Sequence, residues 1–266
     1  MKIIILAAFL VFVSNAHCRE LPEFDCLIEP WQRVDISFSA QGILSDVNVQ
    51  QSQRVEAGQM LASLESDLEK ATLTLRQARS EMLEEIRSAT ASYQFSSRNL
   101  QRLEDLYKKK AVPFYKVDEA KTDLLVNKHR LQQAKDNNQL SVLEVDIAKA
   151  VLRRRSVVSP INGVVVERYK SVGEYVEDEP IMQLVQLHPL RVKVLVPVSM
   201  FGEIKLGMNA KIVPEAPMNE TLRAAKVIVV DPVIDVASGS FSVQLEMSNQ
   251  NFQLPSGLKC GVRFFE

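Results

Sequence analysis

The amino-acid sequence predicts an α+β fold in which a small β-sandwich is split by an inserted antiparallel α-helical hairpin and is followed by a small antiparallel β-barrel. Three observations predict it. Two strand-like segments share one spacing, the long stretch between them is almost free of glycine and proline, and several short alternating segments follow. The 266 residues are enough for two or three small domains, each with its own core.

Residues 1–16 have the pattern of a secretory signal peptide. Lys2 supplies the positive start, residues 3–13 form an apolar run, and small residues end at Ala16, where we expect cleavage. The run is shorter than the roughly 20 residues that cross a bilayer, although retention as an anchor stays open. His17 stands where a lipoprotein signal needs a small residue before Cys18, which disfavours lipidation. We expect a lead-in segment at 17–33.

The two halves of the predicted sandwich are residues 34–66 and 154–188. Both contain short runs of alternating apolar residues, which are typical of half-buried strands. In each half a glycine precedes a valine by 13 residues: Gly42 and Val55, Gly163 and Val176. The repeated spacing predicts two copies of one β-motif.

Residues 67–153 predict the helical hairpin. The first arm, from about 67 to 110, is rich in good helix formers, and the second extends from about Phe114 to Arg153. Each arm carries an apolar seam with steps of three and four, as in a coiled coil. The first seam is Leu68, Ala71, Leu75, Ala78, Met82, Ile86, Ala89, Tyr93, Ser96, Leu100, Leu103 and Tyr107. The second is Val117, Ala120, Leu124, Asn127, Leu131, Ala134, Asn138, Val142, Val145, Ala148 and Leu152.

Each seam contains two successive steps of four, a stutter at which a supercoil locally unwinds. The stutters fall at about the same height if Leu68 lies opposite Leu152, which supports the antiparallel pairing. At 1.5 Å per residue each arm is roughly 60 Å long. A short turn at 110–113 joins the arms, and Pro113 suits the first turn of the second helix.

Residues 189–266 predict the β-barrel. Short alternating segments recur with turn residues between them, which is typical of small antiparallel barrels. The predicted strands lie at 190–196, 210–213, 227–230, 241–247 and 258–264.

The three cysteines, Cys18, Cys26 and Cys260, cannot all pair within one chain. Export would place them in an oxidising compartment. Cys260 lies on the apolar side of its predicted strand. Two interpretations stay open, a buried free thiol and a disulfide between Cys26 and Cys260.

The sequence carries no pattern typical of catalysis. It has no phosphate-binding glycine loop, no nucleophile elbow, and no metal-ligand spacing among its three histidines. The formal net charge of -1 gives no support for nucleic-acid binding. We therefore expect a protein that is not an enzyme, with no cofactor and no metal site.

The paired β-halves resemble the lipoyl/biotinyl fold. Carriers of that fold bear a modified lysine on the tight turn between the halves, and here the hairpin occupies that connection. The resemblance therefore argues against a carrier subunit, which is the alternative from a different functional class.

The whole order of parts resembles the periplasmic adaptor, or membrane fusion protein, family (HlyD-like), in particular the shorter members that serve tripartite efflux pumps. The resemblance covers about residues 30–266. Its patches are 41–44 with 55–61, 159–165 with 173–176, and 231–235 with 239–241. Because the chain ends just after the last predicted strand, we expect the membrane-proximal domain of larger adaptors to be absent or minimal.

The resemblance implies a subunit of the periplasm, peripheral to the inner membrane of a Gram-negative-type bacterium. Its partners would be an inner-membrane efflux transporter of RND type, a TolC-like outer-membrane channel, and further copies in a ring, often of six. An adaptor of an ABC-type exporter or of a type I secretion system is the alternative.

The resemblance also implies that the hairpin tip docks onto the channel. Many channel-docking members carry an arginine, a leucine four residues on, and a serine seven further. Arg102 and Leu106 match, whereas Pro113 stands at the serine position. The alternative for Arg102 is a solvated arginine on a helix surface.

Overall fold

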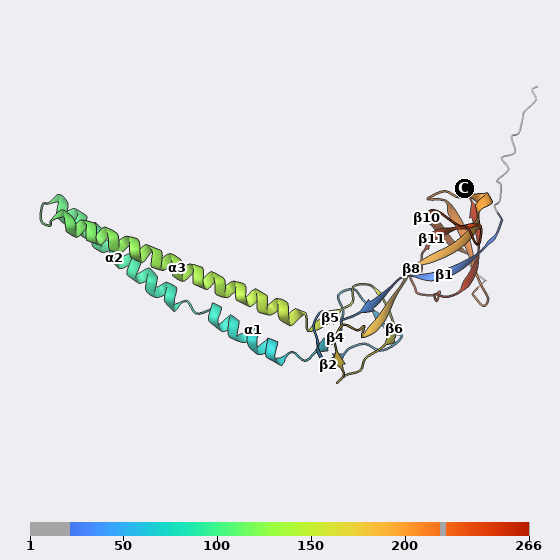
Figure 1. The fold of residues 1–266 in the computed structure, drawn as a ribbon, viewed down its shortest axis with the longest axis horizontal. Coiled ribbons are helices and arrows are strands. Elements are labelled where there is room, and N and C mark those ends of the chain that lie inside the picture. The colour runs from blue at the N-terminus through green and yellow to red at the C-terminus, as the bar shows by residue number, and fades with distance from the viewer. Residues whose placement is uncertain (1–21, 219–221, 266) are drawn as a thin grey trace, which may run out of the picture. The chain divides into compact units, whose positions relative to one another are not determined.

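The computed structural model describes residues 22–218 and 222–265, which divide into two compact units. The hairpin unit is Asp35–Leu184, and the barrel unit combines residues up to Val34 with those from Val185. The predicted signal peptide at 1–16 lies outside the described residues. Figure 1 shows the helices of the hairpin unit and the strands of both units.

The β-part of the hairpin unit is built from six short strands, three from each half of the chain. They are β2 (Gly42–Val47), β3 (Arg54–Val55), β4 (Met60–Leu64), β5 (Ser156–Val158), β6 (Gly163–Arg168) and β7 (Tyr175–Val176). Every cross-half pair is antiparallel: β2 with β7, β3 with β6, and β4 with β5. The predicted split sandwich is therefore confirmed.

The repeated glycine–valine spacing has a structural meaning. Gly42 of the first half lies opposite Val176 of the second, and Val55 lies opposite Gly163. The glycine of each half is thus paired with the valine of the other half. This reciprocal pairing is expected when two copies of one motif are related by approximate twofold symmetry. The insertion of the hairpin between them leaves the pairing intact.

The hairpin contains three helices, α1 (Asp67–Ser80), α2 (Glu84–Lys108) and α3 (Phe114–Arg153). The predicted continuous first arm is therefore wrong at residues 81–83, where the helix is interrupted at the predicted stutter. The side-chain amide of Asn138 on α3 donates a hydrogen bond of 2.8 Å to the carbonyl oxygen of Ser80, the last residue of α1. A stutter turns the apolar seam of a helix away from its partner helix. Here the first arm is interrupted at the stutter.

The predicted seam holds for α2 and for most of α3 but is wrong for α1. On α3, Ala120, Ala134, Val145 and Ala148 are buried, whereas Val142 is exposed. On α1, Leu68, Leu75 and Met82 beyond its end are 76%, 67% and 68% exposed. The face of α1 with lower exposure carries Glu69, Leu73, Arg76 and Ser80 instead.

Ion pairs explain the orientation of α1. Arg76 Nη1 lies 2.5 Å from Glu144 Oε2 on α3, and Arg155 Nη2, just past the end of α3, lies 2.6 Å from Glu69 Oε1. Turning the apolar stripe inward would separate both pairs. Periodicity alone cannot reveal such a choice, because it depends on partners far away in the sequence.

The barrel unit consists of strands in the order β1-β12-β9-β10-β11-β8, and β1 also pairs with β8, so the ring closes. The bounds are β1 (Phe24–Ile36), β8 (Met182–Pro197), β9 (Asn209–Pro214), β10 (Arg223–Asp235), β11 (Ser240–Met247) and β12 (Lys259–Phe265), with a 3-10 helix at Val198–Met200. The core comprises alternating residues of these strands, among them Leu190, Val192, Val194, Phe241 and Val262. The predicted antiparallel barrel is confirmed.

The predicted lead-in at 17–33 differs from the structure. Residues from Phe24 onward form strand β1, and the chain up to Val34 belongs to the barrel unit. Cys26 and Ile28 are buried at alternate positions. That alternation was present in the sequence, but Pro22 and Pro30 obscured it, because proline is normally confined to strand edges and bulges.

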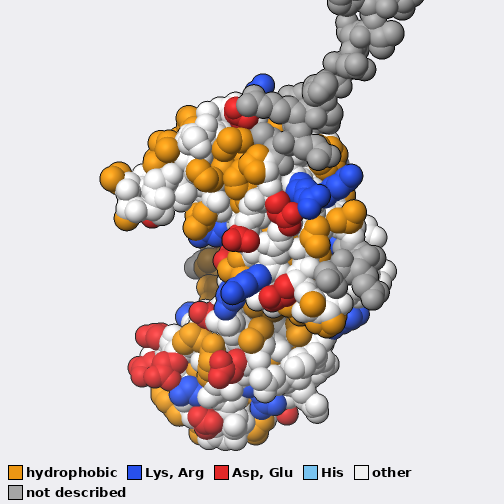
Figure 2. All heavy atoms as spheres, turned by 90° about the vertical axis from the view of Figure 1, so that its right-hand side faces the viewer, with side chains coloured by type: hydrophobic (Ala, Val, Ile, Leu, Met, Phe, Trp, Pro, Cys, Tyr) orange, Lys and Arg blue, Asp and Glu red, His pale blue; other side chains and the backbone are white. Residues whose placement is uncertain are grey.

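Hydrophobic side chains also lie in patches between charged ones on the surface (Figure 2). In the barrel unit the exposed ones include Phe201, Val233 and Val236. No helix in the described part of the chain is both long and apolar enough to cross a lipid bilayer.

Candidate functional site: the hairpin tip and the hairpin base

The turn between α2 and α3 ends one helix and begins the next within five residues. Lys110 adopts a left-handed backbone conformation, with φ of 56°. Its N–H donates to the carbonyl of Tyr107 at 2.8 Å, and the N–H of Ala111 donates to the carbonyl of Leu106 at 2.9 Å. This pair of bonds is a Schellman motif, which satisfies carbonyls at a helix end and fixes the direction of the turn.

Of the three tip residues predicted from the sequence, Pro113 lies in this turn, and the other two lie before it on α2. Arg102 is exposed on α2, Leu106 is half-buried one turn further on, and Pro113 is the exposed N-cap residue of α3. Arg102 and Leu106 share one side of α2, since residues four apart are neighbours on a helix. Pro113 thus stands one position before the helical turn in which the sequence placed it.

Exposed aromatic residues at the tip were missed by the sequence reasoning. Phe114 and Tyr115, the first two residues of α3, are each 63% exposed. The rings of Tyr107 and Phe114 contact edge to face across the turn, with centroids 5.9 Å apart. The sequence could have predicted this exposure, because the aromatic residues at 114 and 115 lie outside the apolar seam.

Positive charge surrounds these rings. Lys108, Lys109 and Lys110 follow one another at the C-terminal end of α2, where the helix dipole favours cations. Lys116 Nζ lies 5.3 Å from the centroid of the Tyr115 ring and 3.1 Å from Glu119 Oε2. The hydrogen bond to Glu119 and its charge raise the pKa of Lys116. The tip therefore presents aromatic rings among lysines and one arginine.

A second candidate surface lies at the base of the hairpin. A groove of about 350 Å³ runs between α1 and α3, with Leu68, Ile147 and Val151 among its lining residues. The exposed leucines of α1 recur at Leu68 and Leu75, and α3 exposes Leu140, Leu143 and Ile147 nearby in sequence. This set, from here called the basal stripe, is Leu68, Leu75, Met82, Leu140, Leu143, Ile147 and Val151.

The base is tied firmly to the sandwich. Arg155 donates to the carbonyl of Gln41 at 2.5 Å as well as to Glu69, and Arg154 donates to the carbonyl of Ser39. Gly42 leaves room for this arrangement, because a Cβ there would lie 2.7 Å from Arg155 Nη1. The hairpin therefore leaves the sandwich at a fixed point.

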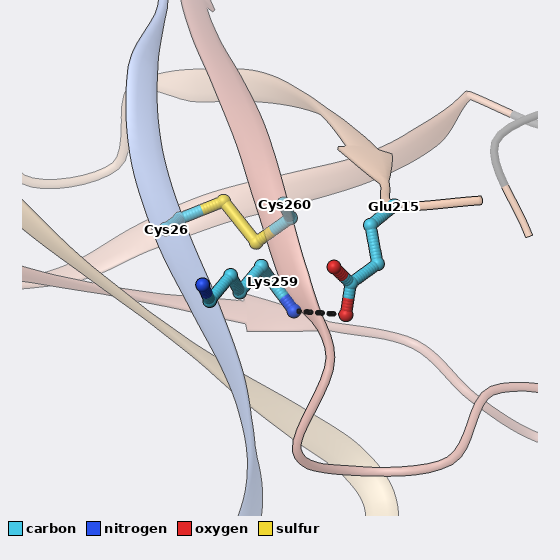
Figure 3. Close-up of a disulfide and its surroundings, with 4 residues drawn as sticks. All are labelled: Cys26, Glu215, Lys259 and Cys260. Atoms are coloured by element: carbon cyan, nitrogen blue, oxygen red, sulfur yellow. Dashed lines mark hydrogen bonds between the residues drawn. A yellow bond between two sulfur atoms is a disulfide. The ribbon is translucent and has the colours of Figure 1, made fainter.

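Cys26 and Cys260 are joined by a disulfide in the barrel unit (Figure 3). The two cysteines are directly opposite each other on β1 and β12. Next to them the backbone N–H of Lys259 donates to Glu215 Oε1 at 3.1 Å. Cys18 lies outside the described residues.

Within the described ranges, no group of three or more His, Cys, Asp or Glu side chains could hold a metal ion. His129 lies on α3 and His188 on β8, far apart in sequence, and His17 falls outside these ranges. The geometry described above offers surfaces for association.

A family model described as the CzcB-like, barrel-sandwich hybrid domain matches residues 32–185. An uncharacterized protein of Haemophilus influenzae is 25% identical over 239 residues, which are 89% of this chain and 55% of that protein. This chain thus spans about half the length of the curated relative it matches.

Solved structures show a similar fold. MacA from Actinobacillus actinomycetemcomitans is 23% identical, with a TM-score of 0.77 over 93% of this chain and 78% of that one. The membrane fusion protein Spr0693 from Streptococcus pneumoniae is 15% identical, with a TM-score of 0.61 over 92% of this chain and 98% of that one. Since the matched family model covers more than half of the sequence, the chain belongs to the CzcB-like barrel-sandwich hybrid domain family.

Proposed function

We propose that the chain is a periplasmic adaptor subunit of a tripartite efflux pump, which links an inner-membrane transporter to a TolC-like outer-membrane channel. The observation that carries the proposal is the hairpin itself. Its 40-residue helix α3 is roughly 60 Å long and ends in an exposed tip of aromatic and cationic side chains. A rigid rod with such a tip suits a connector between two distant partners.

The tip is the surface that we assign to the channel. Tyr, Phe and Arg are common at protein interfaces, where they contribute much of the binding energy. Arg102 can donate to carbonyl or carboxylate oxygens at the end of a partner helix. Leu106 adds apolar contact on the same side of α2, and Phe114 and Tyr115 extend the surface across the turn.

The basal stripe is the surface that we assign to neighbouring copies. Its leucines follow helical spacing but face solvent in a single chain, whereas such seams normally pack against another helix. Two hairpins side by side would cover both stripes. Repetition of this contact around an axis gives a ring, and the family resemblance implies six copies.

For the inner-membrane partner we propose an RND-type transporter. The signal-like residues 1–16 support an exported efflux adaptor over a type I secretion adaptor, which usually keeps an N-terminal membrane helix. An ABC-type exporter remains the alternative partner, and capture of the transporter with the adaptor distinguishes the two.

The proposal is tested by placing a photoreactive residue at position 102 and identifying crosslinked proteins in cells by mass spectrometry. We expect a crosslink to an outer-membrane channel protein. A photoreactive residue at Lys70, exposed on α1 at the base, is the matched control and should not reach the channel. Crosslinks from position 102 only to other copies of the chain, or to no protein, would contradict docking by the tip.

A further inference from the structure

We propose that the disulfide between Cys26 and Cys260 is a redox latch that holds strand β1 in the barrel. In this view oxidation completes the barrel, and reduction frees β1 while the hairpin unit stays folded. The inference does not depend on the adaptor role, because it concerns only how the barrel unit is closed.

Strand β1 is the element that closes the ring, since it pairs with β12 on one side and with β8 on the other. The register with β12 comprises four residue pairs, from Phe24 with Val262 to Leu27 with Lys259. The cysteines form one of these pairs, with Cα atoms 4.8 Å apart. The covalent bond therefore lies within the short ladder that it would secure.

Non-covalent contacts also hold the start of β1. The N–H of Ile28 donates to the carbonyl of Leu258 at 2.9 Å, and the N–H of Gly257 donates to the carbonyl of Ile28 at 2.7 Å. Arg263 Nη2 lies 2.8 Å from Glu23 Oε2, but both side chains are about half exposed, so solvent weakens the pair. The rings of Phe24 and Phe264 contact at 6.0 Å between centroids, and Ile28 is buried. These contacts are non-covalent, so without the disulfide the start of β1 should open locally more often.

Chain topology makes the latch selective. The barrel unit is assembled from two segments of the chain, and the hairpin unit lies entirely between them. The disulfide joins these segments across 234 positions in sequence. All three cysteines of the sequence lie outside Asp35–Leu184, so a thiol reagent can act on no cysteine of the hairpin unit.

The chemistry is thiol–disulfide exchange. Two thiols lose two protons and two electrons to the disulfide of an exchange partner, which leaves as a dithiol. Reduction by dithiothreitol reverses the step and leaves cyclic oxidised dithiothreitol. Cys26 and Cys260 are 7% and 6% exposed, so attack on either sulfur needs at least partial opening of the strand pair.

Hydrogen exchange of the full exported chain, followed by mass spectrometry, tests the proposal with and without dithiothreitol. Reduction should be verified by alkylation of two new thiols. We expect exchange in β1 and β12 to accelerate by about tenfold or more, because the strand pair then opens without its covalent tie. Exchange in β4 and α3 should stay unchanged.

The paired substitution Cys26→Ser with Cys260→Ser should exchange fast at β1 and β12 in either buffer and should not respond to dithiothreitol. Glu23→Gln keeps the disulfide and weakens the neighbouring ion pair, so it should retain slow exchange until reduced. Verified reduction without faster exchange in β1 would overturn the latch. Equal acceleration in both units would overturn its selectivity, because global unfolding would then explain the effect.

Discussion

The distal and basal parts of the hairpin differ in where their apolar residues lie. In α2 they are on the less exposed side, and in α1 they are on the exposed side. Along α2 the predicted seam lies on the less exposed side, with Ile86, Ala89 and Leu100 half-buried and Ser96 buried. Along α1 the apolar stripe is exposed, and the helix contacts α3 through the ion pair of Arg76 with Glu144. The helix break at 81–83 separates the two arrangements.

This difference in packing suggests that the distal and basal parts of the hairpin have different roles. The distal part is stabilised from within, by side chains that interdigitate between α2 and α3. The basal part buries Val145 and Ala148 of α3 and is oriented by the ion pairs of α1, and its basal stripe stays exposed in the single chain. We infer that the distal part maintains the reach of the tip, whereas the basal part serves assembly.

The largest expected effect is at the tip. Arg102→Glu or Leu106→Asp should abolish efflux in cells without a loss of folding, because each change disrupts a surface and not the core. Efflux assays in cells and circular dichroism of the purified chain measure the two properties. Lys121→Glu, the same charge reversal at an exposed position of α3, should leave efflux intact. Normal efflux in both tip variants would remove their role in docking.

A charge placed in the distal interface should cost far more stability than one in the basal stripe. Ala120 is 2% exposed, so Ala120→Asp should destabilise the hairpin unit by about 3 kcal/mol, since it buries an unpaired carboxylate. Leu75→Asp at an exposed site should change stability by less than about 0.5 kcal/mol. Urea unfolding of both variants measures the difference. Equal losses would mean that the two parts are packed alike.

The helix break should depend in part on Asn138. Asn138→Leu removes the 2.8 Å hydrogen bond to the carbonyl of Ser80 and should cost about 1 kcal/mol of local stability. Hydrogen exchange at residues 79–86 measures the opening of this region. Asn137→Leu removes the neighbouring amide, which makes no hydrogen bond to α1 in the described residues, and is the control. The same acceleration there would argue against a specific contact.

The smallest expected effect is at an exposed ion pair in the sandwich. Lys170 Nζ lies 2.6 Å from Glu179 Oε2, and the hydrogen bond from Lys170 and its charge lower the pKa of Glu179 below its ordinary value of 4.5. The folded-state pKa of this carboxyl is depressed, so its contribution is present above pH 4.5 and is lost as pH falls through the lower folded value.

The pKa of Lys170 is raised above 10.5 by the same partner, so the pair contributes between these two pH values. Glu179→Gln should therefore lower the melting temperature slightly at pH 7, and the difference from wild type should shrink as the pH falls through the lowered pKa of Glu179. A difference that does not shrink on acidification would assign the effect to some other contact.

Much of the fold could be predicted from the sequence, because its signals are local. The spacing of Gly42 and Val55 predicts the split sandwich, and the absence of helix breakers predicts the hairpin. The orientation of α1 could not be predicted, since it depends on Glu69 and Arg76 meeting partners at positions 155 and 144. Strand β1 was missed in part because Pro30 within it and Pro22 just before it obscured the alternation.

The candidate site was predicted less completely than the fold. Arg102, Leu106 and Pro113 came from a resemblance, and the structure places the first two on α2 and Pro113 in the turn without testing their role. Phe114 and Tyr115 were overlooked because the seam was read for burial, whereas an interface is recognised by apolar residues that remain exposed. The same reasoning explains why Leu68, Leu75 and Met82 of the basal stripe were predicted to lie inside the hairpin.

The division of tasks along the hairpin is tested most directly by the mass of the assembled protein. Native mass spectrometry of the purified chain should compare wild type, Leu75→Asp with Ile147→Asp, and Arg102→Glu. We predict that the basal pair yields folded single chains, whereas Arg102→Glu assembles like the wild type. Unchanged assembly in the basal pair, or loss of assembly in Arg102→Glu, would contradict the account.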